Sequence, residues 1–245
     1  MQLFTTNVTK VSARWVPKLL GPDNKRIRHN TSRDNLVRFN ADLEKFLQQF
    51  VTMDETWVHH FQPEMKEQSK QWKHPTSPAP KKAKAVMSAG KVMASVFWDA
   101  EGVLMVHYLK KGHTITGTYY ANLLQNLREK IKTVRRGKIT RGVLFHQDNA
   151  PAHKSTVAMA AINECGFEIM EHPPYSPDLA PSDYYLFPKL KKELSGRHLE
   201  TNDDVIDSVN QFLHDQDADF YKTGIEKLHE RWTKCVQLGA DYVEK

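Results

Sequence analysis

The spacing of hydrophobic and polar positions predicts alternating strands and helices along most of the chain. Short apolar runs bounded by turn residues predict strands at Phe50–Met53, Lys91–Trp98, Val103–Tyr108, Gly142–Phe145 and Glu168–Glu171. Apolar positions at helical spacing predict helices at Asp34–Gln49, Gly117–Thr133 and Lys154–Glu164, after an N-cap at Ser182, and over Thr201–Gln237. Three antiparallel-looking strands followed by alternating helices and strands indicate a mixed α/β sheet flanked by helices.

The first forty residues are basic and lack a regular pattern. The chain holds 35 Lys and Arg against 29 Asp and Glu, and residues 1–50 hold nine of the former against four of the latter. Pro17 and the Gly21–Pro22 pair are expected to prevent a long helix here. We therefore interpret residues 1–40 as an extended basic linker segment and residues 41–245 as one domain. Residues 66–84, rich in lysine and proline, are expected to form an inserted loop.

Composition and cysteine content restrict the class of protein. Hydrophobic residues make up 40% of the chain and charged residues 26%, as in a domain with a buried core. The net charge of +6 favours polyanionic partners. Cys165 and Cys235 are too few for a disulfide framework or a cysteine-based zinc site, and suit a reducing compartment. Since the N-terminal sequence lacks the apolar stretch of a secretory signal, we expect a soluble intracellular protein.

Three aspartates are candidates for a metal site that cleaves phosphodiester bonds. Such a site needs several carboxylates at one point, because hard oxygen ligands hold Mg²⁺ or Mn²⁺. Asp54 and Asp148 each follow a predicted strand, and Asp183 starts a predicted helix after a proline-rich bend. An aspartate after a strand is also a common turn or cap residue, so position alone leaves both interpretations open. Glu55 is expected to point away from Asp54, and Asp178 to cap its local backbone.

Three sequence blocks around these aspartates are similar to the catalytic blocks of mariner-family transposases, in the Tc1/mariner superfamily. The blocks are VTMDETWVHHF, HQDNAPAH and HPPYSPDLAPSDYYLF, in that order. Asp148 and Asp183 are separated by 34 residues, as in the family's DD34D pattern. The similarity extends from KVSARWVPKLL at residues 10–20 to RWTKCVQLGADYVEK at residues 231–245.

This resemblance implies a ribonuclease-H-like fold and a transposase that cuts and joins DNA. It implies that Asp54, Asp148 and Asp183 are catalytic and hold two Mg²⁺ or Mn²⁺ ions. The implied reaction is hydrolysis of phosphodiester bonds at the ends of a transposon, followed by strand transfer into target DNA. Domesticated relatives carry Asn at the third position, where this chain keeps Asp183. A homodimer, a double-stranded DNA partner, no membrane association and a nuclear location are expected on the same basis.

The N-terminus departs from the family pattern. Mariner transposases begin with two helix-turn-helix units, whereas about ten residues precede the linker-like motif in this sequence. We therefore expect a catalytic module without its own sequence-specific DNA-binding domain.

Further residues are candidates for contacts with DNA or for the linker between domains. WVPKLL resembles the family's WVP linker, with Lys18 where the family commonly has His, and residues 66–84 resemble its clamp loop. A solvated surface is the alternative for the loop, and a buried structural role is the alternative for His146 and His153, which flank Asp148. The candidates are Trp15, Pro17, Lys18, Trp72, Lys73, Lys81, Lys82 and His153.

Two other functions remain open from the sequence. The chain could be a catalytically inactive, transposon-derived module that binds DNA or dimerises. It could also be a ribonuclease-H-like nuclease that acts on RNA–DNA hybrids, although the sequence blocks match transposases better.

Overall fold

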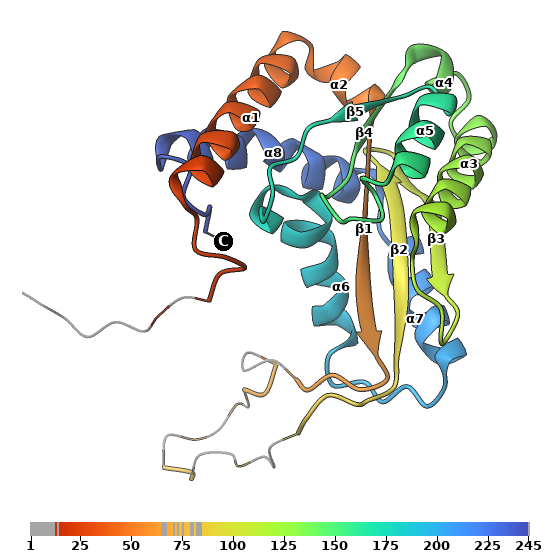
Figure 1. The fold of residues 1–245 in the computed structure, drawn as a ribbon. Helices are drawn as coiled ribbons and strands as arrows, with labels where there is room; N and C mark the ends of the chain where they lie inside the picture. The colour runs from red at the N-terminus through yellow and green to blue at the C-terminus, as the bar shows by residue number, and fades with distance from the viewer. Residues whose placement is uncertain are drawn as a thin grey trace, which may run out of the picture.

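A mixed five-stranded sheet lies between two layers of helices (Figure 1). The computed structural model describes residues 13, 15–64, 68–70, 72, 74, 76–78, 81 and 85–244. The strands are β1 (Phe50–His59), β2 (Lys91–Asp99), β3 (Gly102–Leu109), β4 (Val143–His146) and β5 (Phe167–Met170), in the order β3-β2-β1-β4-β5. β1, β2 and β3 pair antiparallel, whereas β4 runs parallel to β1 and β5 runs parallel to β4. The predicted mixed α/β architecture is confirmed.

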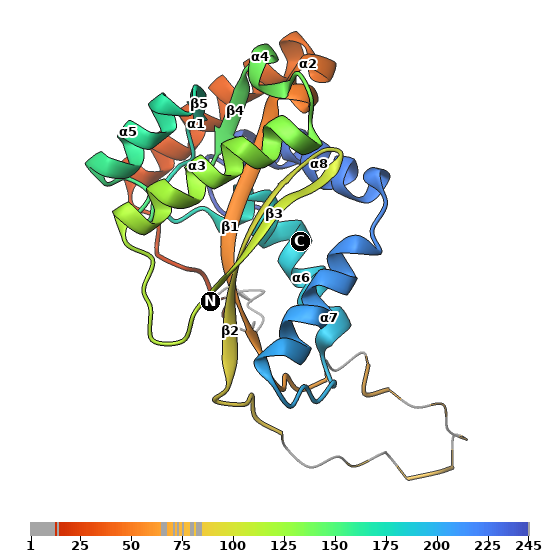
Figure 2. The same cartoon turned by 90° about the vertical axis from the view of Figure 1, so that its right-hand side faces the viewer.

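Helices cover both faces of this sheet. They are α1 (Pro22–Ala41), α2 (Leu43–Gln49), α3 (Gly117–Val134), α4 (Lys138–Arg141), α5 (Thr156–Glu164), α6 (Phe187–Leu194), α7 (Asn202–His214) and α8 (Ala218–Gln237). A 3₁₀ segment, η1 (Pro177–Leu179), and a π-helical segment, η2 (Ser182–Leu186), precede α6. α3 and α5 lie on one face and α6, α7 and α8 on the other (Figures 1 and 2). No helix in the described ranges is both long enough and apolar enough to cross a membrane.

The alternation of side chains along β1 separates two hydrophobic cores. Val51 and Met53 pack with the residues of α3 and α5, whereas Phe50 and Val58 pack with those of α6, α7 and α8. Because successive side chains of a strand point to opposite faces, one hydrophobic core lies on each face of the sheet. The central strand is therefore buried on both sides.

The expectation of an extended, irregular segment is wrong for residues 22–33, because α1 begins at Pro22 and not near the predicted start at Asp34. Pro22 begins this helix instead of preventing it, since proline suits the first helical position. Hydrophobic spacing missed the helix because its buried stripe is mainly polar: Arg28, Ser32 and Asn35 precede Phe39 on that face. α1 packs against α8 and so belongs to the packed domain, and the predicted helix at Asp34–Gln49 is divided by Asp42, which caps α2.

Ser182 does not cap a helix as predicted. It is buried at the start of η2, and its Oγ accepts a hydrogen bond of 3.0 Å from the indole Nε1 of the fully buried Trp98 on β2. Ser182 therefore joins the segment that carries Asp183 to the centre of the sheet.

Replacing Ser182 by alanine is expected to leave the Trp98 indole N–H buried without an acceptor. The expected loss is about 1–3 kcal/mol in the free energy of unfolding, because an unsatisfied buried donor retains its desolvation cost. Urea denaturation followed by far-UV circular dichroism measures this loss. Thr223→Ala, at an exposed position of α8, is a matched control that should change stability by no more than about 0.5 kcal/mol. Equal stability of the two variants would contradict the role given to Ser182.

Candidate active site

Parallel pairing of β1 with β4 brings two of the predicted aspartates to the same level of the sheet. Thr52 of β1 pairs with His146 of β4, and Asp54 and Asp148 each follow their paired residue by two positions. Asp148 lies beyond the end of β4, as predicted. The prediction that Asp54 also follows its strand is wrong, because β1 continues past it in antiparallel register with β2. Strand residues therefore both precede and follow Asp54 in the chain.

Asp183 approaches the same region from η2. It follows a proline-rich loop, and its backbone N–H donates to the carbonyl oxygen of Ala180 at 3.0 Å. Its carboxyl is hydrogen-bonded to the carboxyl of Asp54. The two carboxyls therefore lie close enough for each to influence the pKa of the other.

The pKa values of these two carboxyls reflect their crowding. Burial raises the pKa of Asp183 to about 6, and the charge of Asp148 adds to this, while the hydrogen bond to Asp54 and the charge of Lys191 oppose it. Burial also raises the pKa of Asp54 well above its usual value, and the charges of Asp183, Glu55 and Asp148 raise it further. The three predicted aspartates therefore lie close enough to act on one another electrostatically.

Asp148 differs from the other two because the protein stabilises its ionised form. Its Oδ1 accepts hydrogen bonds from the backbone N–H of Ala150 at 2.9 Å and from Nδ1 of His153 at 2.6 Å. Burial raises the pKa of Asp148, but these two hydrogen bonds outweigh it, and the pKa is lowered. Asp148 is thus an anion at neutral pH.

His153 is a buried bridge between two carboxylates. Its side chain is 2% exposed; Nδ1 contacts Asp148, and Nε2 lies 3.3 Å from Oε1 of Glu55. Burial lowers its pKa, but the hydrogen bonds to Asp148 and Glu55 dominate and raise the pKa to about 9. This buried placement, with both nitrogens in contact with carboxylates, is the structural role that was the alternative for His153, and its contact with DNA stays a prediction.

His146 has the structural role that was the alternative for it. Its ring is buried, with Nδ1 3.0 Å from Oγ1 of Thr52 and Nε2 3.1 Å from Nδ1 of His172. Burial, followed by the charge of His172, lowers the pKa of His146 well below its usual value. Asn149 donates to the carbonyl oxygen of His172 at 2.8 Å. These contacts fix the loop that carries Asp148.

Asp178 was set aside as a candidate metal ligand, and its predicted role in local capping is wrong. Its two carboxylate oxygens accept from the Arg28 guanidinium at 2.9 and 2.8 Å, and Oδ2 also accepts from the backbone N–H of Val243. Asp178 therefore connects the proline-rich loop to α1 and to the C-terminal segment.

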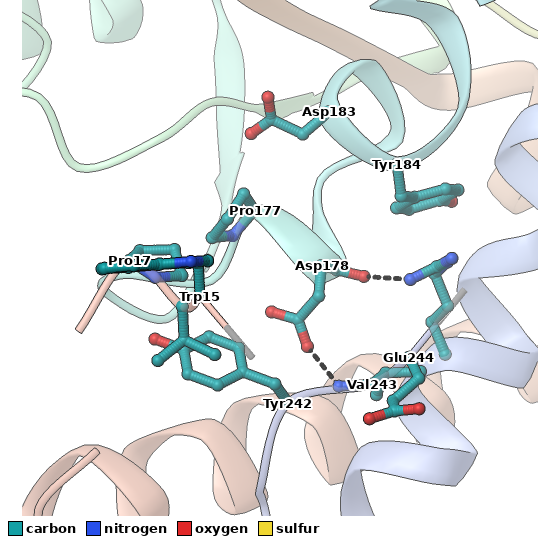
Figure 3. Close-up of a pocket in the computed structure, with 11 residues that line it drawn as sticks. Trp15, Pro17, Pro177, Asp178, Asp183, Tyr184, Tyr242, Val243 and Glu244 are labelled. Atoms are coloured by element: carbon teal, nitrogen blue, oxygen red, sulfur yellow. Dashed lines mark hydrogen bonds between the residues drawn. The ribbon is translucent and has the colours of Figure 1, made fainter. Parts of the chain in front are cut away.

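The WVP stretch lies beside the segment that carries Asp183. Trp15 and Pro17 line a pocket of about 510 Å³ whose walls also include Asp178, Asp183 and Tyr184 (Figure 3). The Trp15 side chain is 97% exposed. Lys18 places its Nζ 4.1 Å from the centre of the Tyr175 ring, and its carbonyl oxygen accepts from the Tyr242 hydroxyl. The predicted linker motif is thus adjacent to a candidate metal ligand.

Two of the four candidates in the inserted loop belong to the described residues. Trp72 and Lys81 are exposed, consistent with either a DNA-contacting loop or a solvated surface. Lys73 and Lys82 lie outside the described residues. Contacts of this loop with DNA stay a prediction.

The three aspartates suit a divalent metal ion. Among the described residues, no three or more His, Cys, Asp or Glu side chains already form a metal-binding set. The donor chemistry nevertheless fits, because carboxylate oxygens are the ligands that Mg²⁺ and Mn²⁺ prefer. The pKa values of Asp54 and Asp183 are raised first by burial and then by neighbouring carboxylates, and a bound cation would offset both effects.

Comparison with known proteins agrees with this geometry. The family model described as Transposase (partial DDE domain) matches residues 62–141. The chain is 34% identical over 233 residues to the Mariner Mos1 transposase of Drosophila mauritiana, covering 94% of this chain and 66% of that protein. It is 32% identical over 232 residues to the human histone-lysine N-methyltransferase SETMAR, covering 94% of this chain and 33% of that protein.

Solved structures give the same result. The Mos1 mariner paired end complex with Mn matches with a TM-score of 0.85 and 33% identity, over 97% of this chain and 69% of that one. The crystal structure of the Mos1 catalytic domain matches with a TM-score of 0.78 and 31% identity, over 94% of this chain and 100% of that one. The chain belongs to the mariner family of transposases. The chain has the ribonuclease-H-like fold of the mariner catalytic domain, as predicted.

This mariner chain spans a third of SETMAR and about two thirds of the Mos1 transposase. Sequence reasoning named the three aspartates but missed Glu55, which contacts His153 beside them, and Arg28, which holds the loop before Asp183. Glu55 was set aside because of its strand face, and Arg28 lay in a segment expected to be irregular. The signal that could have found Arg28 is its place at helical spacing with Ser32 and Phe39 after Pro22.

Proposed function

We propose that this chain is a metal-dependent transposase catalytic domain that hydrolyses phosphodiester bonds at transposon ends and transfers the strands to target DNA. The observation that carries the proposal is the convergence of Asp54, Asp148 and Asp183 from β1, the end of β4 and η2. Three carboxylates from separate elements in mutual electrostatic contact have a high cost in stability. Binding of a cation offsets that cost.

Within this proposal, Asp54, Asp148 and Asp183 hold Mg²⁺ or Mn²⁺, with two ions expected. Such ions activate the attacking oxygen and stabilise the leaving oxygen of a phosphodiester. Solved Mos1 complexes are described as containing Mn or Mg, which supports the choice of metal. The chain's own part is to keep Asp148 ionised through His153 and the Ala150 N–H, and to keep Asp54 rigid within a paired strand.

The proposed partner is double-stranded DNA, both as transposon ends and as target. Mos1 structures described as a paired-end complex and a strand transfer complex support this partner, as does the net charge of +6. A homodimer and a nuclear location are part of the same proposal, since two transposon ends must be held together and the substrate is chromosomal DNA.

Metal-dependent nicking of supercoiled plasmid tests the proposed function. We expect nicking in Mn²⁺ or Mg²⁺, none in Ca²⁺ or with excess chelator, and recovery when Mn²⁺ is restored. An inactive DNA-binding module would instead bind duplex DNA with strong salt dependence and leave the plasmid intact in every metal. A nuclease for hybrids would cut an RNA–DNA duplex in preference to DNA. Either of these results would overturn the proposal.

Metal binding is expected to depend on pH because the candidate ligands must lose their protons. The pKa of Asp183 is raised to about 6, so protons compete with the metal at this carboxyl as the pH falls through about 6, and the raised pKa of Asp54 adds to the competition. Mn²⁺ affinity should fall about tenfold per pH unit below pH 6 for the one proton displaced from Asp183. Calorimetry in buffers of different ionisation enthalpy measures the protons released. An affinity that does not change between pH 5 and 8 would contradict this linkage.

A further inference from the structure

Asp54 and Glu55 are neighbours in β1, and the alternation of the strand sends them to opposite sides of it. Their carboxyl groups nevertheless act on connected parts of the site. The Asp54 carboxyl meets that of Asp183, while the Glu55 carboxylate reaches Nε2 of His153 at 3.3 Å. His153 then contacts Asp148 at 2.6 Å through its other nitrogen. A continuous chain of side chains therefore runs from Glu55 through His153 to a proposed metal ligand.

The middle member of this chain has little freedom to move. His153 is 2% exposed, and its ring lies against the ring of Tyr120, with centroids 4.1 Å apart. The Tyr120 hydroxyl donates to Gln147 at 2.6 Å, and Gln147 donates in turn to the backbone carbonyl oxygen of His153 at 3.5 Å. Turning the imidazole would break its contacts with both Glu55 and Asp148.

The contact with His153 fixes one carboxylate oxygen of Asp148, Oδ1, and leaves the other oxygen, Oδ2, for a metal ion. Both hydrogen bonds to this carboxylate, from Ala150 and His153, go to Oδ1. Among the described residues, no hydrogen bond to Oδ2 is found, and the side chain is 44% exposed. A carboxylate with one oxygen held by the protein presents the second oxygen in a fixed direction, which is what a metal ligand requires.

We propose that Glu55 is a positioning residue that acts through His153 to orient the Asp148 carboxylate for metal binding, without itself contacting the metal. The inference rests on the proposed function, in which Asp148 is a metal ligand. Glu55 accepts the hydrogen bond from Nε2, so the opposite nitrogen stays directed at Asp148. Supporting groups behind a metal ligand commonly change metal affinity by about 10–100-fold when removed.

The test compares Glu55→Leu with Glu55→Gln in the DNA-free protein. Glutamine keeps an oxygen that can accept from His153, whereas leucine removes the acceptor and keeps a similar volume. Mn²⁺ affinity is measured from the electron paramagnetic resonance signal of the free ion. We expect about 10–100-fold weaker binding for Glu55→Leu and a change of no more than about threefold for Glu55→Gln. Glu44→Leu, at an exposed position of α2, is the matched control and should bind as the parent does.

Two further measurements separate the possible failures. Asp148→Ala reports on the proposed function, because unchanged Mn²⁺ binding in that variant would remove Asp148 from the site. If Asp148→Ala loses binding while Glu55→Leu keeps it, the positioning role alone is overturned. Equal losses in Glu55→Leu and Glu55→Gln would also overturn it, because the negative charge and not the hydrogen bond would then matter. Long-range ¹H–¹⁵N spectra of the His153 ring should change in Glu55→Leu and stay close to the parent in Glu55→Gln.

Discussion

Replacing Asp148 by asparagine is expected to reduce metal-dependent nicking of DNA by about a hundredfold or more, since a metal site supplies several kcal/mol of transition-state stabilisation. The asparagine side chain has nearly the same shape and retains an oxygen that can accept from His153 and Ala150. It loses the negative charge that a Mg²⁺ or Mn²⁺ ligand supplies. Nicking of supercoiled plasmid under single-turnover conditions measures the loss.

The fold of this variant should remain intact, which separates chemistry from stability. The charge of Asp148 contributes to the raised pKa values of Asp54 and Asp183, so removing it relieves repulsion within the cluster. The loss of the ion pair with the buried His153 opposes this relief, so we expect only a small fall in the melting temperature. Asp34→Asn, an exposed aspartate on α1, is the matched control and should nick as the parent does. A fully active Asp148→Asn variant would remove this residue from the proposed metal site.

Replacing Arg28 by methionine is expected to destabilise the domain by about 3–5 kcal/mol, because it leaves a buried carboxylate without its partner. Arg28 is fully buried, and the Asp178 side chain with which it pairs is 10% exposed. The guanidinium also donates to Ser176 and to the carbonyl oxygens of Ala240 and Asp241. One side chain therefore connects α1, the loop before Asp183 and the C-terminal segment. The melting temperature should fall by on the order of 10 °C.

The contribution of the ion pair itself can be separated from that of the surrounding hydrogen bonds. Arg28→Met combined with Asp178→Asn removes both charges and should recover part of the stability lost in Arg28→Met alone. Arg26→Met provides the matched control on the same helix, because its pair with Asp23 is exposed and contributes little. Thermal unfolding of the four proteins by calorimetry completes the comparison. A loss in Arg28→Met no larger than that in Arg26→Met would exclude Arg28 as the centre of this junction.

Features that depend on local pattern were predicted well. The strands β2, β3, β4 and β5 and the helices α3 and α5 lie within one or two residues of their predicted ranges. Their residues are buried on one side or both, so hydrophobic spacing records their position directly. The predicted end of β1 at Met53 was too early. Polar residues such as Asp54 and Glu55 also pair with β2, so the strand continues beyond its apolar part.

Features that depend on polar pairing between distant residues were not predicted. α1 was missed because Arg28, Ser32 and Asn35 occupy its buried stripe, and Arg28 finds its partner 150 positions away. Glu55 was set aside although His153, 98 positions later, brings it into contact with the site. The local spacing of polar residues does not indicate either pair, because the partners are far apart in the sequence.

The sequence by itself determined the mixed sheet and its principal helices, and the three motif blocks with their interval singled out Asp54, Asp148 and Asp183 as candidates. Only the tertiary structure decided how those aspartates are supported. Hydrophobic periodicity is a property of neighbouring residues and can be read directly from the sequence. A buried hydrogen bond or ion pair exists only once folding has brought both partners out of water together, and so Arg28 with Asp178, and Glu55 with His153, are visible only in the fold.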